Sequence, residues 1–328
     1  MVMYWVALLA ISVLIYLLLD GFDLGVGMLF GLAGNATKRN AMLSTVAPVW
    51  DGNETWLVVT GVIMWGAFPV VYAMVLSAFY IPVLVMLLGL ILRGVAFEFR
   101  GKAHRSRWVW DVSFVAGSFA ASFMQGAMVG ALVEGLQFSN GDYTGGTLGW
   151  LTPFSALCGI GLCFGYALLG ACWLVRKSEG PVRDDARRQI PPLAIGVLAF
   201  LVVVFGYALV EHLPILQRWT DRPYLFVFPA IGAGAAAMLA KSILNHDDYW
   251  PFHMVALIFV TAFATLALSF WPYMIPGVVT IDEAAAPHSS LAFMFWGAGL
   301  FVFPLMLLYM LVGYRIFRGK AAPAADHY

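Results

Sequence analysis

The sequence predicts an all-α protein that crosses a membrane many times, because of its composition and its nine long apolar runs. Of its 328 residues, 62% are hydrophobic and only 11% are charged, and the mean hydropathy is +0.86. Soluble domains are ~45–50% apolar and ~25% charged, so this chain has too few polar side chains to cover a water-exposed surface. The composition therefore excludes the soluble-enzyme, nucleic-acid-binding and disordered classes.

The apolar runs have the length of membrane helices, which need ~20 residues to cross the hydrocarbon layer. In chain order they are roughly 4–32, 48–70, 73–99, 112–136, 151–175, 192–210, 224–244, 252–273 and 290–313. None shows the apolar-polar alternation of a barrel strand. We expect one integral membrane domain over residues 1–328, with nine helices arranged as two four-helix bundles plus one extra helix.

The positive charges predict the orientation of these helices. Of the 18 Lys and Arg residues, 15 fall in gaps on one side of the membrane, two fall on the other side, and Arg93 lies within a run. The positive-inside rule places the C-terminus in the cytoplasm and the N-terminus outside, in the periplasm. The first run has no basic residues before it and exceeds the length of a signal sequence, so we expect it to remain as a membrane helix.

Two carboxylates lie inside the first run. Asp20 and Asp23 are three residues apart and therefore share a helix face. If the helix leaves the membrane near residue 32, Asp23 is ~13 Å and Asp20 ~18 Å from its inner end. Ionisable groups at such depth are costly and are candidates for proton or ion handling. The alternative is a structural pair satisfied by a neighbouring helix.

Two further carboxylates begin the second run. Asp51 and Glu54 are again three residues apart, near the cytoplasmic surface. Acidic residues are favoured in the first turn of a helix, so capping and a functional role are both open for them. In order of depth, Asp51 and Glu54, then Asp23, then Asp20 form a possible ladder for protons.

Arg93 is the basic residue inside the third run. A buried guanidinium keeps its charge, so Arg93 must face protein and pair with a carboxylate; we expect Asp23 or Asp51. Arg100, at the inner end of the same run, is a second candidate for ion pairing. Pairing holds an acid ionised, so the carboxylate that carries protons should be the less tightly paired one. Gln125, mid-span in the fourth run, is expected to link helices.

The sequence shows no pattern for a metal or haem site in this chain. The three cysteines have no zinc-ligand spacing and are interpreted as small hydrophobic residues. Intramembrane haem requires axial His or Met, and none of the six histidines lies mid-span, so we expect no haem or metal bound by this chain. These histidines are His104, His212, His246, His253, His288 and His327.

Four segments carry a resemblance to a known family. They are DGFDLGVGML (20–29), APVWDGNETWLV (47–58), RGVAFEFR (93–100) and WPYMIPGVVTIDEAAAPHSSLAFM (271–294). The first three resemble signature stretches of subunit II of the cytochrome bd-type quinol oxidases. The fourth is similar to the corresponding region of the cyanide-insensitive oxidase branch.

The resemblance implies a heterodimeric ubiquinol oxidase of the aerobic respiratory chain, in the bacterial inner membrane. Subunit I would bind the b- and d-type haems, oxidise the external quinol and reduce O2 to water. This chain would be the haem-free subunit II, with two four-helix bundles and a peripheral helix, and no catalytic residue of its own. A small single-helix accessory subunit and a structural ubiquinone occur in some members.

The resemblance also implies roles for the acids. Asp51 would stand at the cytoplasmic entrance of a proton path towards the haems, and Asp20 and Asp23 occupy the family's DGFD motif. Glu54 departs from the Gln of other members, which adds a possible proton carrier or only a surface acid. Two other hypotheses remain: a secondary transporter that uses intramembrane carboxylates as ion-coupling sites, and a purely structural partner whose acids are all paired.

Overall fold

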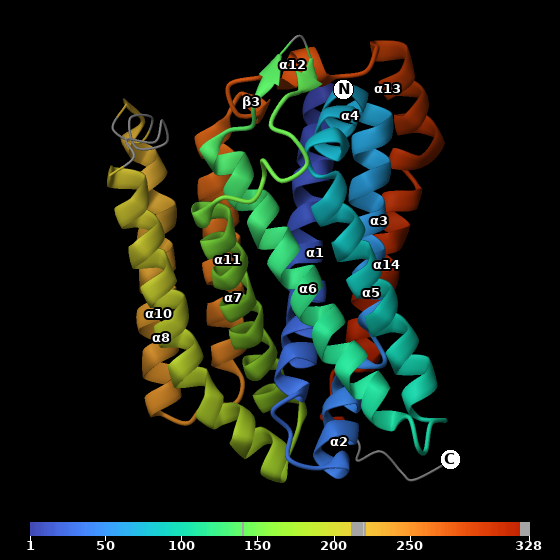
Figure 1. Ribbon diagram of the computed structural model, residues 1–328, viewed down its shortest axis with the longest axis vertical. Helices are drawn as coiled ribbons and strands as arrows, with labels where there is room; N and C mark the ends of the chain where they lie inside the picture. Colours follow the sequence, from blue (N-terminus) through green and yellow to red (C-terminus); the bar gives the residue numbers. More distant parts are fainter. Residues whose placement is uncertain (140, 211–218, 220, 322–328) are drawn as a thin grey trace.

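The protein is a layered assembly of long helices that run along one axis (Figure 1). The computed structural model describes residues 1–139, 141–210, 219 and 221–321, so His212, Arg218 and His327 lie outside the described residues. Within these ranges, eight helical segments are long and apolar enough to cross a membrane. The predicted fold class, an all-α polytopic membrane protein, is confirmed.

The first bundle is built around α1, Val2–Phe30. It packs against α3, Trp50–Ala67, and α6, Arg107–Glu134, which in turn packs against α5, Tyr80–Arg100. The short helix α2, Ala36–Val46, lies at the end of the bundle opposite the N-terminus (Figure 1). The 18-residue α3 is the second predicted run; it is not among the eight apolar segments because its first turns are polar.

The third predicted run is broken into two helices. Helix α4, Pro69–Ala78, and helix α5 are separated by a single residue, Phe79. Pro82 has no N–H to donate to the preceding turn, so the hydrogen-bond ladder cannot run through this point. Pro69, in turn, starts α4 as the first helical residue, where its missing N–H costs nothing.

The second bundle contains α7, Pro153–Lys177, and α8, Gly180–Val210, followed by α10, Val227–Leu244, and α11, Trp250–Phe270. A 3-10 turn, η1 Pro223–Phe226, leads into α10. Helix α7 also packs against α1 and α6, so it joins the two bundles. It is accordingly the most buried of the eight segments: 83% of an 18-residue apolar stretch of α7 is buried inside the protein.

The last predicted run forms the peripheral helix. It consists of α13, His288–Met294, a π-helical segment η2, Phe295–Gly299, and α14, Val302–Ile316. No residue of α14 is buried, in keeping with its place at the edge of the first bundle (Figure 1). The extra helix that the span count predicts is therefore this one.

Short strands and one helical turn cover the end of the molecule where the N-terminus lies (Figure 1). The hairpins are β1, Phe138–Ser139, with β2, Asp142–Tyr143, and β3, Tyr273–Ile275, with β4, Val279–Thr280. The second hairpin leads to α12, Ile281–Ala284. A capping box fixes the start of α12: the N–H and hydroxyl of Thr280 both donate to the Glu283 carboxylate, which lowers the pKa of Glu283 below its usual value.

The two bundles meet at a close crossing of α1 and α7. Gly25 and Gly170 face each other there, and a Cβ atom on Gly25 would overlap the carbonyl oxygen of Tyr166. Three buried cysteines, Cys158, Cys163 and Cys172, lie along α7, as expected for small hydrophobic residues. The crossing therefore depends on the absence of side chains rather than on polar contacts.

We expect Gly25→Ala to destabilise the protein by about 1–3 kcal/mol, because the methyl group forces the two backbones apart. The thermal unfolding midpoint of the purified protein would show the loss. Gly34→Ala, in the loop after α1 with open space around it, is the matched control and should leave the midpoint unchanged. Equal midpoints for both variants would contradict the proposed close packing.

Candidate functional site

The four candidate carboxylates are arranged by burial as the sequence predicts. Asp51 is exposed at the start of α3, and the Glu54 side chain, one turn further in, is 27% exposed. On α1, Asp23 is 2% exposed and Asp20 is fully buried. The acids therefore form a series from the protein surface into the interior of the first bundle.

Arg93 binds two of these acids at once. Its Nη1 lies 2.7 Å from Asp20 Oδ1, and its Nη2 donates to Glu54 Oε2 at 2.8 Å. The guanidinium is completely buried. This ion cluster ties α5 to both α1 and α3.

We expected Arg93 to pair with Asp23 or Asp51, and this expectation was wrong. Asp51 lies one turn nearer the surface than Glu54, so Glu54 is the acid of α3 that faces the buried guanidinium. Asp23 is engaged instead by the amide of Asn53, whose Nδ2 donates to Asp23 Oδ2 at 2.7 Å. The same amide accepts a 2.8 Å hydrogen bond from the Tyr314 hydroxyl of α14 on its Oδ1.

These two networks separate the acids by their bonding partners. Asp20 and Glu54 share the charge of Arg93, whereas Asp23 has no ion-pair partner in the described part of the chain. Its Oδ2 accepts from Asn53, while its Oδ1 accepts no hydrogen bond from the described residues. Asp23 is thus the less tightly paired acid of the two on α1.

Only one of the two acids of α3 lies in the first turn, where an acidic side chain can stabilise the helix start. Asp51 is in the first turn of α3, where a negative charge is favoured by the helix dipole. Glu54 is the fifth residue of the helix and reaches Arg93 instead of a backbone N–H. Its charge is therefore part of the buried cluster.

Arg100 pairs away from this cluster. Arg100 forms an ion pair with Asp111 of α6, and the Nη1 of Arg100 donates to Asn40 Oδ1 at 2.7 Å. Asp111 also binds Arg39 Nη1 at 2.7 Å. Both guanidinium groups lie over the ring of Phe30. Arg100 therefore clamps α2, α5 and α6 together at this end of the bundle.

A polar trio continues inward from Asp20. Tyr16 lies one turn before Asp20 on α1, and its hydroxyl accepts from Gln125 Nε2 at 2.7 Å. The hydroxyl of Tyr166 donates to Gln125 Oε1 at 2.8 Å. Gln125 thus links α6 to α1 and α7, as predicted for a mid-span amide.

The histidines that the structure describes lie at helix ends or in loops. His104 and His246 are in connecting segments, and His253 and His288 are in the first turns of α11 and α13. Among the described residues, no group of three His, Cys, Asp or Glu side chains is placed to hold a metal ion.

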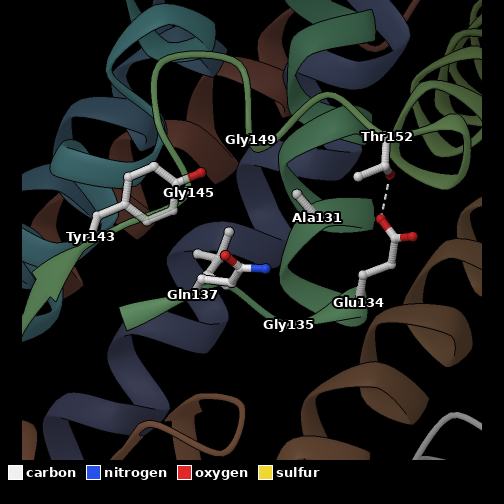
Figure 2. A pocket seen from close by; sticks show the side chains of 9 residues that line it. Ala131, Glu134, Gly135, Gln137, Tyr143, Gly145, Gly149 and Thr152 are labelled. Carbon is white, nitrogen blue, oxygen red and sulfur yellow. Dashed lines mark hydrogen bonds between the residues drawn. The ribbon is translucent and has the colours of Figure 1, made fainter. Parts of the chain in front are cut away.

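A separate hollow of about 200 Å³ lies at the opposite end of α6. Figure 2 shows Glu134 and Thr152 on one side of it, joined by a hydrogen bond, and the ring of Tyr143 on the other. The Tyr207 hydroxyl donates to the second Glu134 oxygen at 3.1 Å. Both oxygens of the Glu134 carboxylate are therefore hydrogen-bonded, whereas Oδ1 of Asp23 accepts no hydrogen bond from the described residues.

Comparison with known proteins identifies the family of this helical membrane protein. Residues 1–317 match the sequence model of a family described as "Cytochrome bd terminal oxidase subunit II". The chain belongs to this family. It is therefore a respiratory oxidase subunit of the bacterial cell membrane, and its family resemblance is confirmed.

Curated relatives of this bd-oxidase subunit cover most of its length. A probable cytochrome oxidase subunit 2 of Haemophilus influenzae is 30% identical over 94% of this chain and 89% of the relative. Subunit 2 of the cytochrome bd-I ubiquinol oxidase of Escherichia coli K12 is 28% identical over 93% of this chain and 91% of the relative. Subunit 2 of the cytochrome bd ubiquinol oxidase of Bacillus subtilis is 28% identical over 97% and 96%.

The fold is also found in a solved structure. A chain of the bd oxidase from Geobacillus thermodenitrificans superposes with a TM-score of 0.74, at 14% identity, over 97% of this chain and 95% of that one. At this identity the likeness concerns the fold, which agrees with the two bundles and the peripheral helix described above.

We expect Arg93→Gln to be strongly destabilising, by about 3–5 kcal/mol, because it leaves Asp20 and Glu54 buried without their cation. Adding Asp20→Asn should recover part of this loss by removing one of the two unpaired charges. The yield and thermal unfolding midpoint of the purified complex would measure both effects. Arg315→Gln, at the exposed end of α14, is the control; equal stability of Arg93→Gln and Arg315→Gln would contradict the proposed cluster.

Proposed function

We propose that this chain is the haem-free subunit of a ubiquinol oxidase and that it conducts protons from the cytoplasm towards the haems of a partner subunit I. The graded burial of Asp51, Glu54, Asp23 and Asp20 carries the proposal. Four carboxylates along two adjacent helices are costly in a membrane unless they are paired or carry ions. Membership of the oxidase family favours proton conduction over the secondary transporter that the carboxylates alone left open.

In this proposal the acids have different roles. Asp51 takes protons from water at the inner surface, and Glu54 leads to the Arg93 cluster. Asp20 and Glu54 are held by Arg93, so Asp23 is the buried carboxyl that takes up and releases a proton. Quinol oxidation outside and oxygen reduction with protons from inside would then build a membrane potential without a pump.

The orientation and partners follow from the same proposal. The N-terminus lies in the periplasm and the C-terminus in the cytoplasm, within one membrane domain over 1–328. The names of the relatives support ubiquinol as the electron donor. Haem b and haem d-type centres belong to subunit I, and a small single-helix subunit and a structural ubiquinone are further expected components.

One face of α3 is suited to the partner subunit. Asp51, Glu54, Val58, Val62 and Trp65 are spaced by three or four residues and so form one stripe along the helix. The three apolar members are 53–66% exposed in this chain. Since acids at the inner end of this stripe are unfavourable against lipid, we place subunit I over it.

A cysteine at Val62 should therefore crosslink to subunit I in the native complex. The chain's own described cysteines are buried and should not react. Leu198→Cys on α8, which is 61% exposed on the other bundle, is the control and should remain uncrosslinked. Crosslinking from position 198 but not from position 62 would place the partner elsewhere.

The central test concerns Asp51. Asp51→Asn keeps the shape of the side chain and removes the titratable proton, so turnover should fall while assembly and haem content stay near normal. Asp51→Glu should retain more activity because it keeps a carboxylate. Oxygen consumption per haem in the purified complex measures the effect.

Asp282→Asn is the matched control, because Asp282 is also an exposed acid in the first turn of a helix. It should have wild-type turnover. If Asp51 only stabilises the start of α3, Asp51→Asn should cost ~1 kcal/mol of stability with little change in turnover. Wild-type turnover in Asp51→Asn would reject an obligatory proton role for this residue.

A further inference from the structure

A second cavity lies at the inner end of the protein, beside the residues that lead into α3; Asp51 and Glu54 are not among its lining residues. It has a volume of about 390 Å³ and lies between the end of α2, the end of α7 and the last turn of α14. Its wall includes Thr45, Val49, Trp173 and Tyr314. Since a water molecule occupies ≈ 30 Å³ in the liquid, the cavity has room for several.

The chain beyond α14 forms one wall of this cavity and is fastened to α7. The Lys177 ammonium donates to the carbonyl oxygens of Phe317 and Gly319, and the Ala321 N–H donates to Lys177 O at 2.8 Å. The positive charge of the ammonium is therefore stabilised by backbone carbonyl oxygens just after α14. Lys320 is likewise bound, to Ser178 O at 3.1 Å and to Asp248 at 3.5 Å.

Tyr314 connects the cavity to the buried acid Asp23. Its ring packs edge-on against Trp173, with centroids 6.3 Å apart, and its hydroxyl donates to Asn53 Oδ1. The other end of the same amide donates to Asp23 Oδ2. A helix with no buried residue thus places one hydroxyl two hydrogen bonds from a carboxyl that is 2% exposed.

We propose that this cavity is a second cytoplasmic entrance for protons, which reaches Asp23 past Tyr314 and Asn53 in parallel with the Asp51 entrance. This inference rests on the proposed proton-conducting function of the subunit. A proton that enters from the inner aqueous phase as hydronium passes along the water of the cavity and joins the free oxygen Oδ1 of Asp23; neutral water is left behind, and no electron moves. Asn53 acts as a gate, because an amide has no hydroxyl proton to pass on and must turn aside to admit water.

The geometry explains why two acids on one helix face have different partners. Asp20 and Glu54 share the charge of Arg93, on the side of the Asp51 entrance. Asp23 is reached from the cavity through Tyr314 and Asn53. The Asp51 route passes Glu54 and the Arg93 cluster before it reaches Asp23, whereas the cavity route passes Tyr314 and Asn53.

The test is a double-mutant cycle on turnover per haem in the purified complex, with Asp51→Asn, Tyr314→Phe and their combination. Tyr314→Phe keeps the ring against Trp173 and removes the hydroxyl. Parallel routes that share the flux predict a loss of about twofold for each single variant and about tenfold or more for the double variant. Tyr309→Phe, 74% exposed on the same helix, should have wild-type turnover.

A variant from another wall of the cavity gives an independent measurement. Ser44→Phe on α2 fills the cavity and should lower turnover as Tyr314→Phe does, whereas Ser44→Ala should not. In Ser44→Phe and Tyr314→Phe the solvent isotope effect on turnover should rise, because proton supply becomes limiting. A merely structural role for Tyr314 would change the haem content but not the isotope effect.

The outcomes separate this entrance from the Asp51 entrance. Wild-type turnover in Tyr314→Phe, with a double variant no slower than Asp51→Asn, overturns the second entrance and leaves the Asp51 proposal standing. If the turnover of the double variant equals that of the slower single variant, both residues lie on one route in series, and this result also overturns the second entrance. Wild-type turnover in Asp51→Asn with slow turnover in Tyr314→Phe rejects the Asp51 entrance and supports this one.

Discussion

The buried guanidinium of Arg93 sets the arrangement of the first bundle. A charge that cannot be neutralised inside a membrane must be matched by carboxylates, so α5 has to meet both Asp20 of α1 and Glu54 of α3. Breaking either contact would leave an unpaired charge in an apolar interior. The contact of Glu54 with Arg93 also places the Asn53 amide, one residue earlier on α3, against α1, where it donates to Asp23.

The cluster also divides the acids of α1 into two kinds. Asp20 is fixed by an ion pair, and the trio of Tyr16, Gln125 and Tyr166 continues the polar groups inward from it. Among the described residues, Asp23 is held only by a neutral amide. A fixed charge and a neighbouring carboxyl that is free to change its charge suit a proton path better than two acids that are both tightly paired.

Sequence reasoning predicted what depends on local composition. The helical spans, the depth order of Asp51, Asp23 and Asp20, and the linking role of Gln125 follow from hydropathy, helix rise and the cost of burying polar groups. It did not predict contacts between distant segments: Asn53 and Tyr314 are 261 residues apart, and although Asn53 lies in the segment 47–58, neither local sequence indicates that these two side chains meet. The partners of Arg93 were wrong for the same reason, because they depend on how α1, α3 and α5 rotate against one another.

The most direct test of the central claim, that Asp23 rather than Asp20 exchanges its proton during turnover, is infrared difference spectroscopy of the native complex on reduction and reoxidation. The account predicts a carbonyl stretching signal of a protonated carboxyl group that disappears in Asp23→Asn and persists in Asp20→Asn. A signal that persists in Asp23→Asn and disappears only in Asp20→Asn would contradict it.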